Sequence, residues 1–407
     1  MAQKRNMKWL LFRMLPKLPI FLLALPFVLL MRALRPFIKI RFVPILERIG
    51  HGFGTTDIYL QERRAGFCPS DAVDIFYPDR PWKCNRQMVK MWKRVVPLYD
   101  FAYWVAWASL NVPGFEPYHY DLPPDIQDTH GLTNDTPPPA SFSLKEEERG
   151  AKLLREMGIP PGSPIICFQA RDSSFLNALK PEKNWSYHNY RDADINTYTL
   201  AIKELVARGY YCIRMGRVVN QPFLWKHPHV IDYATSSWRS DFADMYLLSR
   251  CHFYVGTSSG IDFIATFFRK PQVILNMIPV VNTCAWSPDN SVIYKKIWVP
   301  REKRSLTFKE ILGFNVDMYQ DPVQFKNLGL EIIDNTPQEI LDVVIEKEES
   351  IRGCWQTNDE CEELQQRFWA LFRPYASGRV LQARVGSKFL LQNKDLLDLK
   401  MAKQGVG

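Results

Sequence analysis

The stretch that decides the fold is Asp241–Leu275, DFADMYLLSRCHFYVGTSSGIDFIATFFRKPQVIL. Its apolar spacing and turn residues predict, in order, a helix over 241–249, a strand over 252–255, a polar turn over 256–260, a helix over 261–268 and a strand over 272–275. A strand that leads through a short turn into a helix and then into another strand is the repeating unit of a parallel α/β sheet. We therefore expect an α/β fold.

The turn Gly256-Thr257-Ser258-Ser259-Gly260 carries no bulky side chain. Free backbone N–H groups and the dipole of the following helix favour an anion at such a turn, most often phosphate. Glycine lets a ligand approach the backbone closely. The alternative is a plain turn capped by Thr257 or Ser258. The turn is neither a G-x-G-x-x-G fingerprint nor a P-loop with its lysine.

Strands and helices alternate through both halves of the chain, which predicts two Rossmann-like domains. We expect strands at 42–49, 72–77, 165–169, 210–215 and 230–233, helices at 85–95, 144–157 and 197–208, a glycine-rich loop at 50–57 and a loop-rich stretch at 276–300. The expected divisions are an N-terminal segment 1–41, an acceptor domain with a proline-rich linker 42–143, a donor domain 144–350 and a helical extension 351–407.

Ligands of such sheets bind at the carboxyl ends of the strands. The candidate binding residues at these positions are Arg171, Asp172, Gly216, Arg217, Asp241, Thr257, Ser258, Ser259 and Gly260, and His51 and Asp57 lie in the glycine-rich loop. A guanidinium at Arg171 suits a diphosphate, which it can bind through two hydrogen bonds. The alternatives are a surface pair between Arg171 and Asp172, and a packing role for His51.

The Asp192-x-Asp194 pair invites a metal site. It directly precedes a helix, however, where aspartate is a favoured cap, so we expect no bound metal.

The net charge of +9 is concentrated at one end of the chain. Nine of the 52 Lys and Arg residues fall within positions 1–41, which hold no Asp or Glu, and the remaining 43 balance the 43 acidic residues. A neutral body argues against nucleic-acid binding. The eight cysteines form no C-x-x-C pair, which indicates reduced thiols of a cytosolic protein.

Within this basic segment, residues 18–31, LPIFLLALPFVLLM, carry no charge. Fourteen residues are short of the roughly 20 that a spanning helix needs. We expect a helix lying on an anionic membrane surface, at the cytoplasmic face of the inner membrane. A single-pass anchor and a buried N-terminal helix are the alternatives.

The ordered set IICFQARDSSF, YRDADINTY, IRMG, WRSDFADMYLLS and GTSSG resembles a little-characterised bacterial family of GT-B-type glycosyltransferases. The resemblance covers about residues 42–300. The first and last motifs are distantly similar to those of GDP-fucose-dependent fucosyltransferases. Gln169 stands where that pattern has His, and Gly256-Thr257 replaces an Asn-containing turn, so the donor sugar stays open.

The resemblance implies two domains that move a sugar from a nucleotide-sugar, with a GDP-linked sugar as one option, to a glycan or lipid-linked acceptor without a cofactor. The same resemblance implies that Arg171 neutralises the departing diphosphate and that Thr257, Ser258, Ser259 and Gly260 bind the same phosphates. Asp172, Gly216, Arg217 and Asp241 lie near the donor. His51, and after it Asp57, are the candidates for the base. An epimerase-like enzyme or a non-catalytic scaffold are the alternative functions.

Overall fold

The structure is a computed structural model, and it divides the chain into two compact units. It describes residues 18–68, 71–80, 83–114, 118–120, 122, 123, 126–179, 181, 182, 184–313, 321–376 and 378–398. The first unit comprises the chain up to residue 126 with 139–141, and the second comprises 127–138 and everything from 142 onward. Each unit is described by itself below.

A seven-stranded sheet organises the second unit, and all of its strands pair in parallel. Its order is β12 (Arg384–Val385), β8 (Asn290–Tyr294), β7 (Gln272–Met277), β6 (Phe253–Thr257), β3 (Ile165–Gln169), β4 (Tyr211–Arg214) and β5 (Val230–Ile231). Its central strands are buried along almost their whole length, as expected of parallel strands covered on both faces. The predicted α/β fold is confirmed for this unit.

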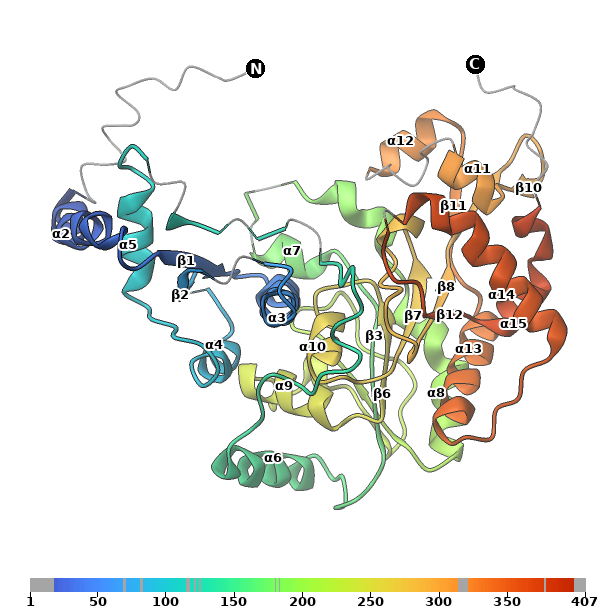
Figure 1. Cartoon of the computed structure of the whole chain (residues 1–407). Coiled ribbons are helices and arrows are strands. Elements are labelled where there is room, and N and C mark those ends of the chain that lie inside the picture. The colour runs from blue at the N-terminus through green and yellow to red at the C-terminus, as the bar shows by residue number, and fades with distance from the viewer. Residues whose placement is uncertain are drawn as a thin grey trace. The chain divides into compact units, whose positions relative to one another are not determined.

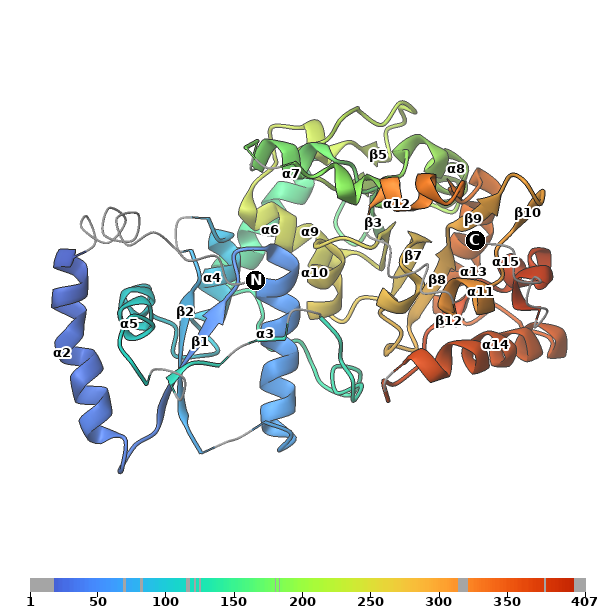
Figure 2. The ribbon, with the colours of Figure 1, turned by 90° about the horizontal axis from the view of Figure 1, so that it is seen from above.

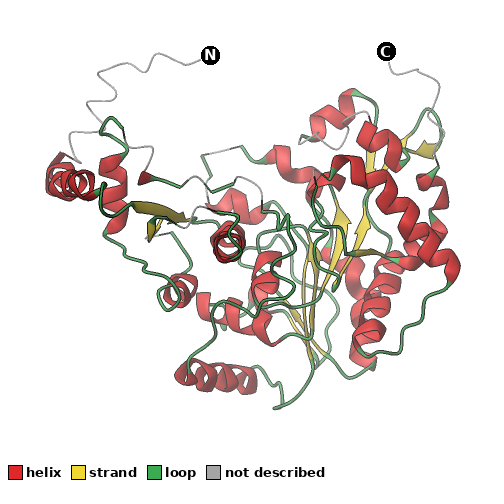
Figure 3. Cartoon of the chain, in the orientation of Figure 1, coloured by secondary structure: helices red, strands yellow, loops and turns green. Residues whose placement is uncertain are grey.

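Helices cover both faces of this sheet, as Figures 1 and 3 show. Helices α9 and α10 pack on one face against β3 and β6, and α8 and α13 pack on the other against β4, β7 and β8. The helices and 3-10 turns of this unit are α6 (Leu144–Glu156), α7 (Ser174–Leu179), η3 (Ser186–Arg191), η4 (Ile195–Tyr198), α8 (Thr199–Ala207), η5 (Tyr233–Thr235), α9 (Asp241–Arg250), α10 (Asp262–Phe267), η6 (Val280–Asn282), α11 (Phe308–Gly313), α12 (Pro322–Asn327), α13 (Pro337–Ile351), α14 (Asp359–Phe372), η8 (Arg373–Tyr375), α15 (Ser387–Gln392) and η9 (Lys394–Leu397).

Two stretches differ from the sequence-based expectation. Residues 276–300, expected to be loop-rich, contain β8 and also β9 (Lys296–Val299). Strand β9 forms a small antiparallel sheet with β10 (Arg304–Ser305) and β11 (Glu331–Ile333). Residues beyond 350 were expected to form a separate extension, yet β12 joins the large sheet. The ring of Phe368 in α14 lies 5.3 Å from Tyr294 of β8.

The first unit contains a two-stranded parallel sheet, β1 (Ile40–Ile45) with β2 (Val73–Pro78). Single bridges add His119 beside Phe42 and Leu98 beside Phe76, one on each strand. The helices of this unit are α2 (Leu18–Leu34), α3 (Ile49–Arg64), α4 (Arg86–Trp92) and α5 (Ala102–Ser109). Parallel pairing is thus confirmed, but within the described residues this sheet is smaller than that of a full Rossmann domain.

Helix α2 covers the expected apolar run, and one of its faces is packed within the first unit. Ala24, Val28 and Met31 are buried against α5, and the rings of Phe21 and Trp107 meet edge to face at 6.3 Å. Figure 2 shows α2 and α5 side by side. In the described part of the chain, none of the helices combines the length and the apolarity needed to cross a bilayer. The basic residues at 4, 5, 8, 13 and 17 lie outside the described residues.

The prediction of a glycine-rich loop at 50–57 is wrong, because these residues form the first half of α3. One of its glycines, Gly52, allows close packing of α3 against α4. A Cβ added at Gly52 would lie 2.6 Å from the sulfur of Met88 and 2.7 Å from the carbonyl oxygen of Leu46. The indole N–H of Trp92 donates to the Gly52 carbonyl at 3.0 Å. Local sequence cannot distinguish glycine that bends the chain from glycine that admits a neighbouring helix.

We predict that Gly52→Ala lowers the free energy of unfolding of the first unit by about 1–3 kcal/mol, the usual cost of overpacking. The measurement is urea denaturation of the full chain. The control is Gly313→Ala, where the added Cβ meets nothing closer than 3.9 Å. Unchanged stability in Gly52→Ala would show that α3 and α4 do not approach this closely.

Candidate functional site

The turn that follows β6 is built around one tyrosine and one glycine. Tyr254 and Gly256 are two residues apart on the strand, so their side chains lie on the same face of the sheet. The phenol of Tyr254 runs over Gly256, where an added Cβ would come within 2.2 Å of the hydroxyl oxygen. This path brings the hydroxyl to the start of α10, where it donates to the Asp262 carboxylate at 2.9 Å. Glycine at 256 is therefore required by the ring of Tyr254.

Asp262 holds the predicted anion turn together from inside. Its carboxylate accepts the backbone N–H of Ser259 at 2.7 Å and the Ser259 hydroxyl at 3.1 Å. Gln169, at the end of β3, lies 3.2 Å from the same hydroxyl. Burial raises the pKa of Asp262 to about 7, although the hydrogen bonds from Ser259 and Tyr254 oppose the rise. One of the N–H groups expected to face an anion is thus already bound by an internal carboxylate.

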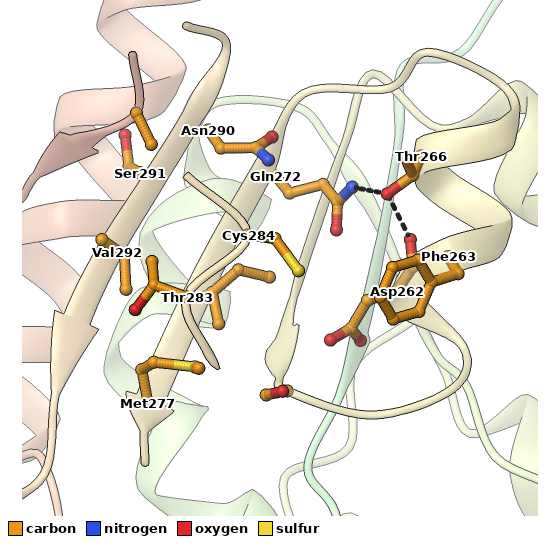
Figure 4. A pocket seen from close by; sticks show the side chains of 13 residues that line it. Asp262, Phe263, Thr266, Gln272, Met277, Thr283, Cys284, Asn290, Ser291 and Val292 are labelled. Atoms are coloured by element: carbon orange, nitrogen blue, oxygen red, sulfur yellow. Dashed lines mark hydrogen bonds between the residues drawn. The ribbon is translucent and has the colours of Figure 1, made fainter. Parts of the chain in front are cut away.

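A small cavity lies behind this turn, and Figure 4 shows its lining. The Gln272 amide donates to the Thr266 hydroxyl at 2.8 Å, and this hydroxyl donates to the Asp262 carbonyl oxygen at 3.2 Å. The volume of about 10 Å³ suits about one water molecule. The cavity is therefore part of the support of the turn and is too small for a substrate.

Arg171 lies at the carboxyl end of β3, as predicted, and its backbone and side chain are both engaged. Its N–H donates to the Thr257 hydroxyl at 2.8 Å, which ties the ends of β3 and β6 together. Its guanidinium pairs with Asp192 and donates to the His188 carbonyl oxygen at 3.1 Å. The side chain is only 10% exposed. Burial lowers the pKa of Arg171 and raises that of Asp192.

The alternative expectation, a surface pair between Arg171 and Asp172, is wrong. Its carboxylate instead accepts the backbone N–H groups of Ser174 at 2.9 Å and Asn220 at 3.1 Å. Asp172 therefore joins the loops that follow β3 and β4.

Two further cations stand beside Arg171. The Arg191 guanidinium donates to the carbonyl oxygen of Ser258 in the turn. Lys295, directly after β8, donates to the Asp192 carbonyl oxygen at 2.6 Å and pairs with Asp334 at 2.7 Å. Burial lowers the pKa of Lys295, whose side chain is 3% exposed. We call Arg171, Arg191 and Lys295 the cation cluster. With Asp192 and Asp334 the group carries one net positive charge at the edge of the sheet.

The structure places the other predicted site residues in three groups. In the first group, Gly216 and Arg217 follow β4, and Asp241 begins α9. Burial raises the pKa of the nearby Asp244 to about 6, and the charges of Arg217 and Asp241 also act on this pKa. Ser258 and Ser259 lie in the turn with the exposed Gly260. His51 and Asp57 belong to the first unit. His51 is partly exposed, whereas Asp57 is 2% exposed within α3 and accepts from Gln61 at 3.2 Å.

The second residue of the Asp-x-Asp pair, Asp194, caps η4 by accepting from the Asn196 N–H at 2.9 Å. Within the described residues, no group of three or more His, Cys, Asp or Glu side chains could hold a metal ion.

Sequence analysis missed Arg191, Lys295 and Asp262. Lys295 was missed because the short run Ser-Val-Ile-Tyr before it was not taken as a strand; the β-branched residues and tyrosine, followed by Lys-Lys, were the available signal. Arg191 lies in the same YRDADINTY motif as the Asp-x-Asp pair. Asp262 is a charged residue inside an apolar helix, which itself suggests a structural partner.

No family model matches the chain, and no curated protein matches it in sequence. The search of solved structures gave distant likenesses. A glycosyl transferase family 9 protein from Veillonella parvula DSM 2008 is 11% identical, covering 63% of this chain and 86% of its own, with a TM-score of 0.38.

ADP-heptose lps heptosyltransferase II from E. coli is 15% identical over 77% of this chain and 98% of its own, with a TM-score of 0.38. The dodecameric iron-containing glycosyltransferase TibC from enterotoxigenic E. coli H10407 is 14% identical over 62% and 64%, with a TM-score of 0.33. TM-scores below 0.5 are too low to establish an activity. These three proteins are not described as fucosyltransferases, and the GDP-linked donor stays a prediction.

We predict that Asp262→Asn flattens the pH dependence of stability between about pH 4 and 7. The folded pKa of about 7 lies above the reference value of 3.8, so in this window the folded chain holds a proton that the unfolded chain has lost. Wild-type stability should then fall as pH rises, by at most about 1.4 kcal/mol per pH unit. The asparagine amide resembles the protonated carboxyl and should remove the contribution of Asp262 to this slope, while the contribution of Asp244, whose pKa burial raises to about 6, remains.

The measurement is urea unfolding at pH 5, 6 and 7. The control Asp359→Asn changes an exposed residue in the first turn of α14 and should retain the wild-type slope. Equal slopes in Asp262→Asn and wild type would mean that Asp262 is ionised throughout this range.

Proposed function

We propose that the chain is a glycosyltransferase that moves a sugar from a nucleotide-sugar to a polysaccharide or lipid-linked acceptor without a metal. The observation that carries the proposal is the cation cluster at the carboxyl edge of the parallel sheet. Arg171 and Arg191 follow β3, and Lys295 follows β8. The Arg171 N–H and the Arg191 guanidinium contact the start of the anion turn, and Lys295 joins them through the Asp192 carbonyl oxygen. The ordered motifs that resemble the GT-B-type family include Arg171, Arg191 and the turn.

The chemistry of this proposal places new negative charge on the donor diphosphate. The acceptor hydroxyl oxygen forms a bond to the anomeric carbon as the bond from that carbon to the diphosphate oxygen breaks. The electron pair of the broken bond leaves with the nucleoside diphosphate, and the hydroxyl proton passes to a base. Fixed cations at the departing oxygen stabilise that charge without reorganising. We propose His51 as the base, since Asp57 is buried within α3.

The Asp192 carboxylate would control the binding of an anion to Arg171, because it pairs with the same guanidinium. It neutralises the buried Arg171 guanidinium when no anion is present, because an unpaired buried charge would cost several kcal/mol. A diphosphate must compete with this carboxylate for Arg171. Burial raises the pKa of Asp192, which favours protonation of its carboxylate once a diphosphate has taken Arg171.

We predict that Arg171→Ala combined with Asp192→Asn abolishes stabilisation of the full chain by nucleoside diphosphates. Losing charge-assisted hydrogen bonds to the anion should weaken binding by about 10- to 100-fold. The double variant is used because Arg171→Ala alone would leave Asp192 without its arginine. The measurement is the rise in melting temperature with a panel of nucleoside diphosphates and nucleotide-sugars, since a ligand of the folded state raises it by mass action.

The single variant Asp192→Asn is the matched control, and it should bind the same ligand at least as tightly as wild type because the competitor of Arg171 is gone. Arg352→Ala, which removes an exposed arginine that pairs with the buried Glu348 at the end of α13, should bind the ligand as wild type does. A folded wild type that responds to none of these ligands would contradict the proposal and favour a non-catalytic scaffold. Turnover of the nucleotide-sugar without an acceptor would favour an epimerase.

We also propose that the chain contacts the cytoplasmic face of an anionic membrane through α2. The outer face of this helix is apolar, with Leu22, Leu23 and Phe27 at 56%, 74% and 57% exposure. Water-exposed apolar surface on one helix is typical of proteins that bind at a lipid interface. The basic residues that flank the apolar run suit anionic head groups. The opposite face is packed on α5, which favours a helix that lies on the membrane.

We predict that Leu22→Ser, Phe27→Ser and Leu30→Ser together reduce binding to anionic liposomes by at least about tenfold, because each large apolar side chain contributes about 1.5–3 kcal/mol on burial. The measurement is co-flotation of the full chain. The control replaces the exposed Leu144, Leu224 and Val323 with serine and should not change binding. Equal flotation of both triple variants would contradict a role for α2.

A further inference from the structure

An open hollow of about 270 Å³ in the second unit is not used by the site described above. It is lined by Asn189, Tyr190, Pro322, Phe325, Lys326, Leu330 and Ile332. These residues come from η3, α12, β11 and the residue that precedes β11. Figure 1 shows α12 above β11.

The lining suits a ring with polar substituents. Tyr190 and Phe325 form the aromatic base of the hollow, with ring centroids 6.0 Å apart and planes inclined by 31°, and they are only 6% and 2% exposed. Leu330 and Ile332 add aliphatic surface, and the exposed Lys326 and the amide of Asn189 supply polar groups. Apolar surface of this kind packs against the face of a planar base or the C–H face of a sugar. Lysine and amide groups can then bind the oxygens of the ring substituents.

The hollow adjoins the cation cluster along two segments. Tyr190, in its base, directly precedes Arg191 and Asp192, and Arg171 donates to the carbonyl oxygen of His188 just before them. On the other side, Ile332 is two residues from Asp334, the partner of Lys295. Arg171 and Arg191 both lie close enough to Tyr190 to lower the pKa of its phenol, which burial raises. A phosphate on the cluster would therefore hold an attached ring near the hollow.

We infer that this hollow binds one ring end of the phosphorylated donor, either the nucleoside or the sugar, while the attached phosphate contacts the cation cluster. The inference rests on the proposed function and adds the place of a ring. The volume of about 270 Å³ is slightly below the range of about 300–1,000 Å³ typical of pockets for drug-sized ligands, so it suits one ring end and not the whole nucleotide-sugar.

The test compares probes that share a phosphate and differ in the ring. Inorganic pyrophosphate, the four common nucleoside monophosphates and a set of hexose 1-phosphates are titrated calorimetrically into the full chain. Two variants alter the hollow, Lys326→Ala at its rim and Leu330→Trp to fill it. Lys152→Ala, which removes an exposed lysine of α6, is the control.

We expect at least one ring phosphate to bind wild type more tightly than pyrophosphate does. Each hollow variant should weaken the binding of that ring phosphate by about tenfold or more and leave the binding of pyrophosphate unchanged. Preference for a nucleoside monophosphate assigns the hollow to the nucleoside end, and preference for a hexose 1-phosphate assigns it to the sugar end. Ring phosphates that bind no better than pyrophosphate, or hollow variants that bind them as wild type does, overturn the inference alone. Failure of pyrophosphate and of every ring phosphate to bind wild type overturns the proposed function as well.

Discussion

The buried pair of Arg171 and Asp192 is the constraint on which the carboxyl edge of the large sheet depends. A guanidinium that is 10% exposed needs a compensating carboxylate, and the same aspartate supplies a carbonyl oxygen to Lys295. Strands β3 and β8, which are remote in sequence, thereby end at one charged group. The Thr257 hydroxyl connects the end of β6 to the same group by accepting from the Arg171 backbone N–H. The charges of this edge are paired within the protein, so an anionic ligand must replace an internal partner.

The sequence allowed the architecture of the second unit to be predicted for a physical reason. Parallel strands that are buried on both faces must be short apolar runs, and IICFQ and the strands of Asp241–Leu275 have this form. Strand β8 was not predicted, because its sequence Asn290-Ser291-Val292-Ile293-Tyr294 contains two polar residues, which are nevertheless buried. Burial of polar side chains depends on tertiary partners, which local pattern does not reveal.

The candidate site was predictable only in part, for a related reason. Position at a strand end identified Arg171 and the turn, since topology alone brings strand ends together. The partner of Arg171 was not predictable, because Asp192 is 21 residues away and the adjacent Asp172 is an equally charged neighbour. The glycines at 50–54 predicted a loop because local sequence does not reveal the partners of Gly52 in α4, more than 30 residues farther along the chain.

The ring of Tyr254 lying over Gly256 has a consequence for the order in which this sequence can change. A side chain at 256 cannot coexist with the phenol at 254, so substitution at 256 is open only to a lineage that has first lost the ring. Losing the ring removes a hydrogen bond from the buried Asp262 and leaves this carboxyl less well satisfied. Positions 254, 256 and 262 are therefore expected to change together. Tyr254 must be replaced before Gly256, and its replacement removes a hydrogen bond from the Asp262 carboxylate.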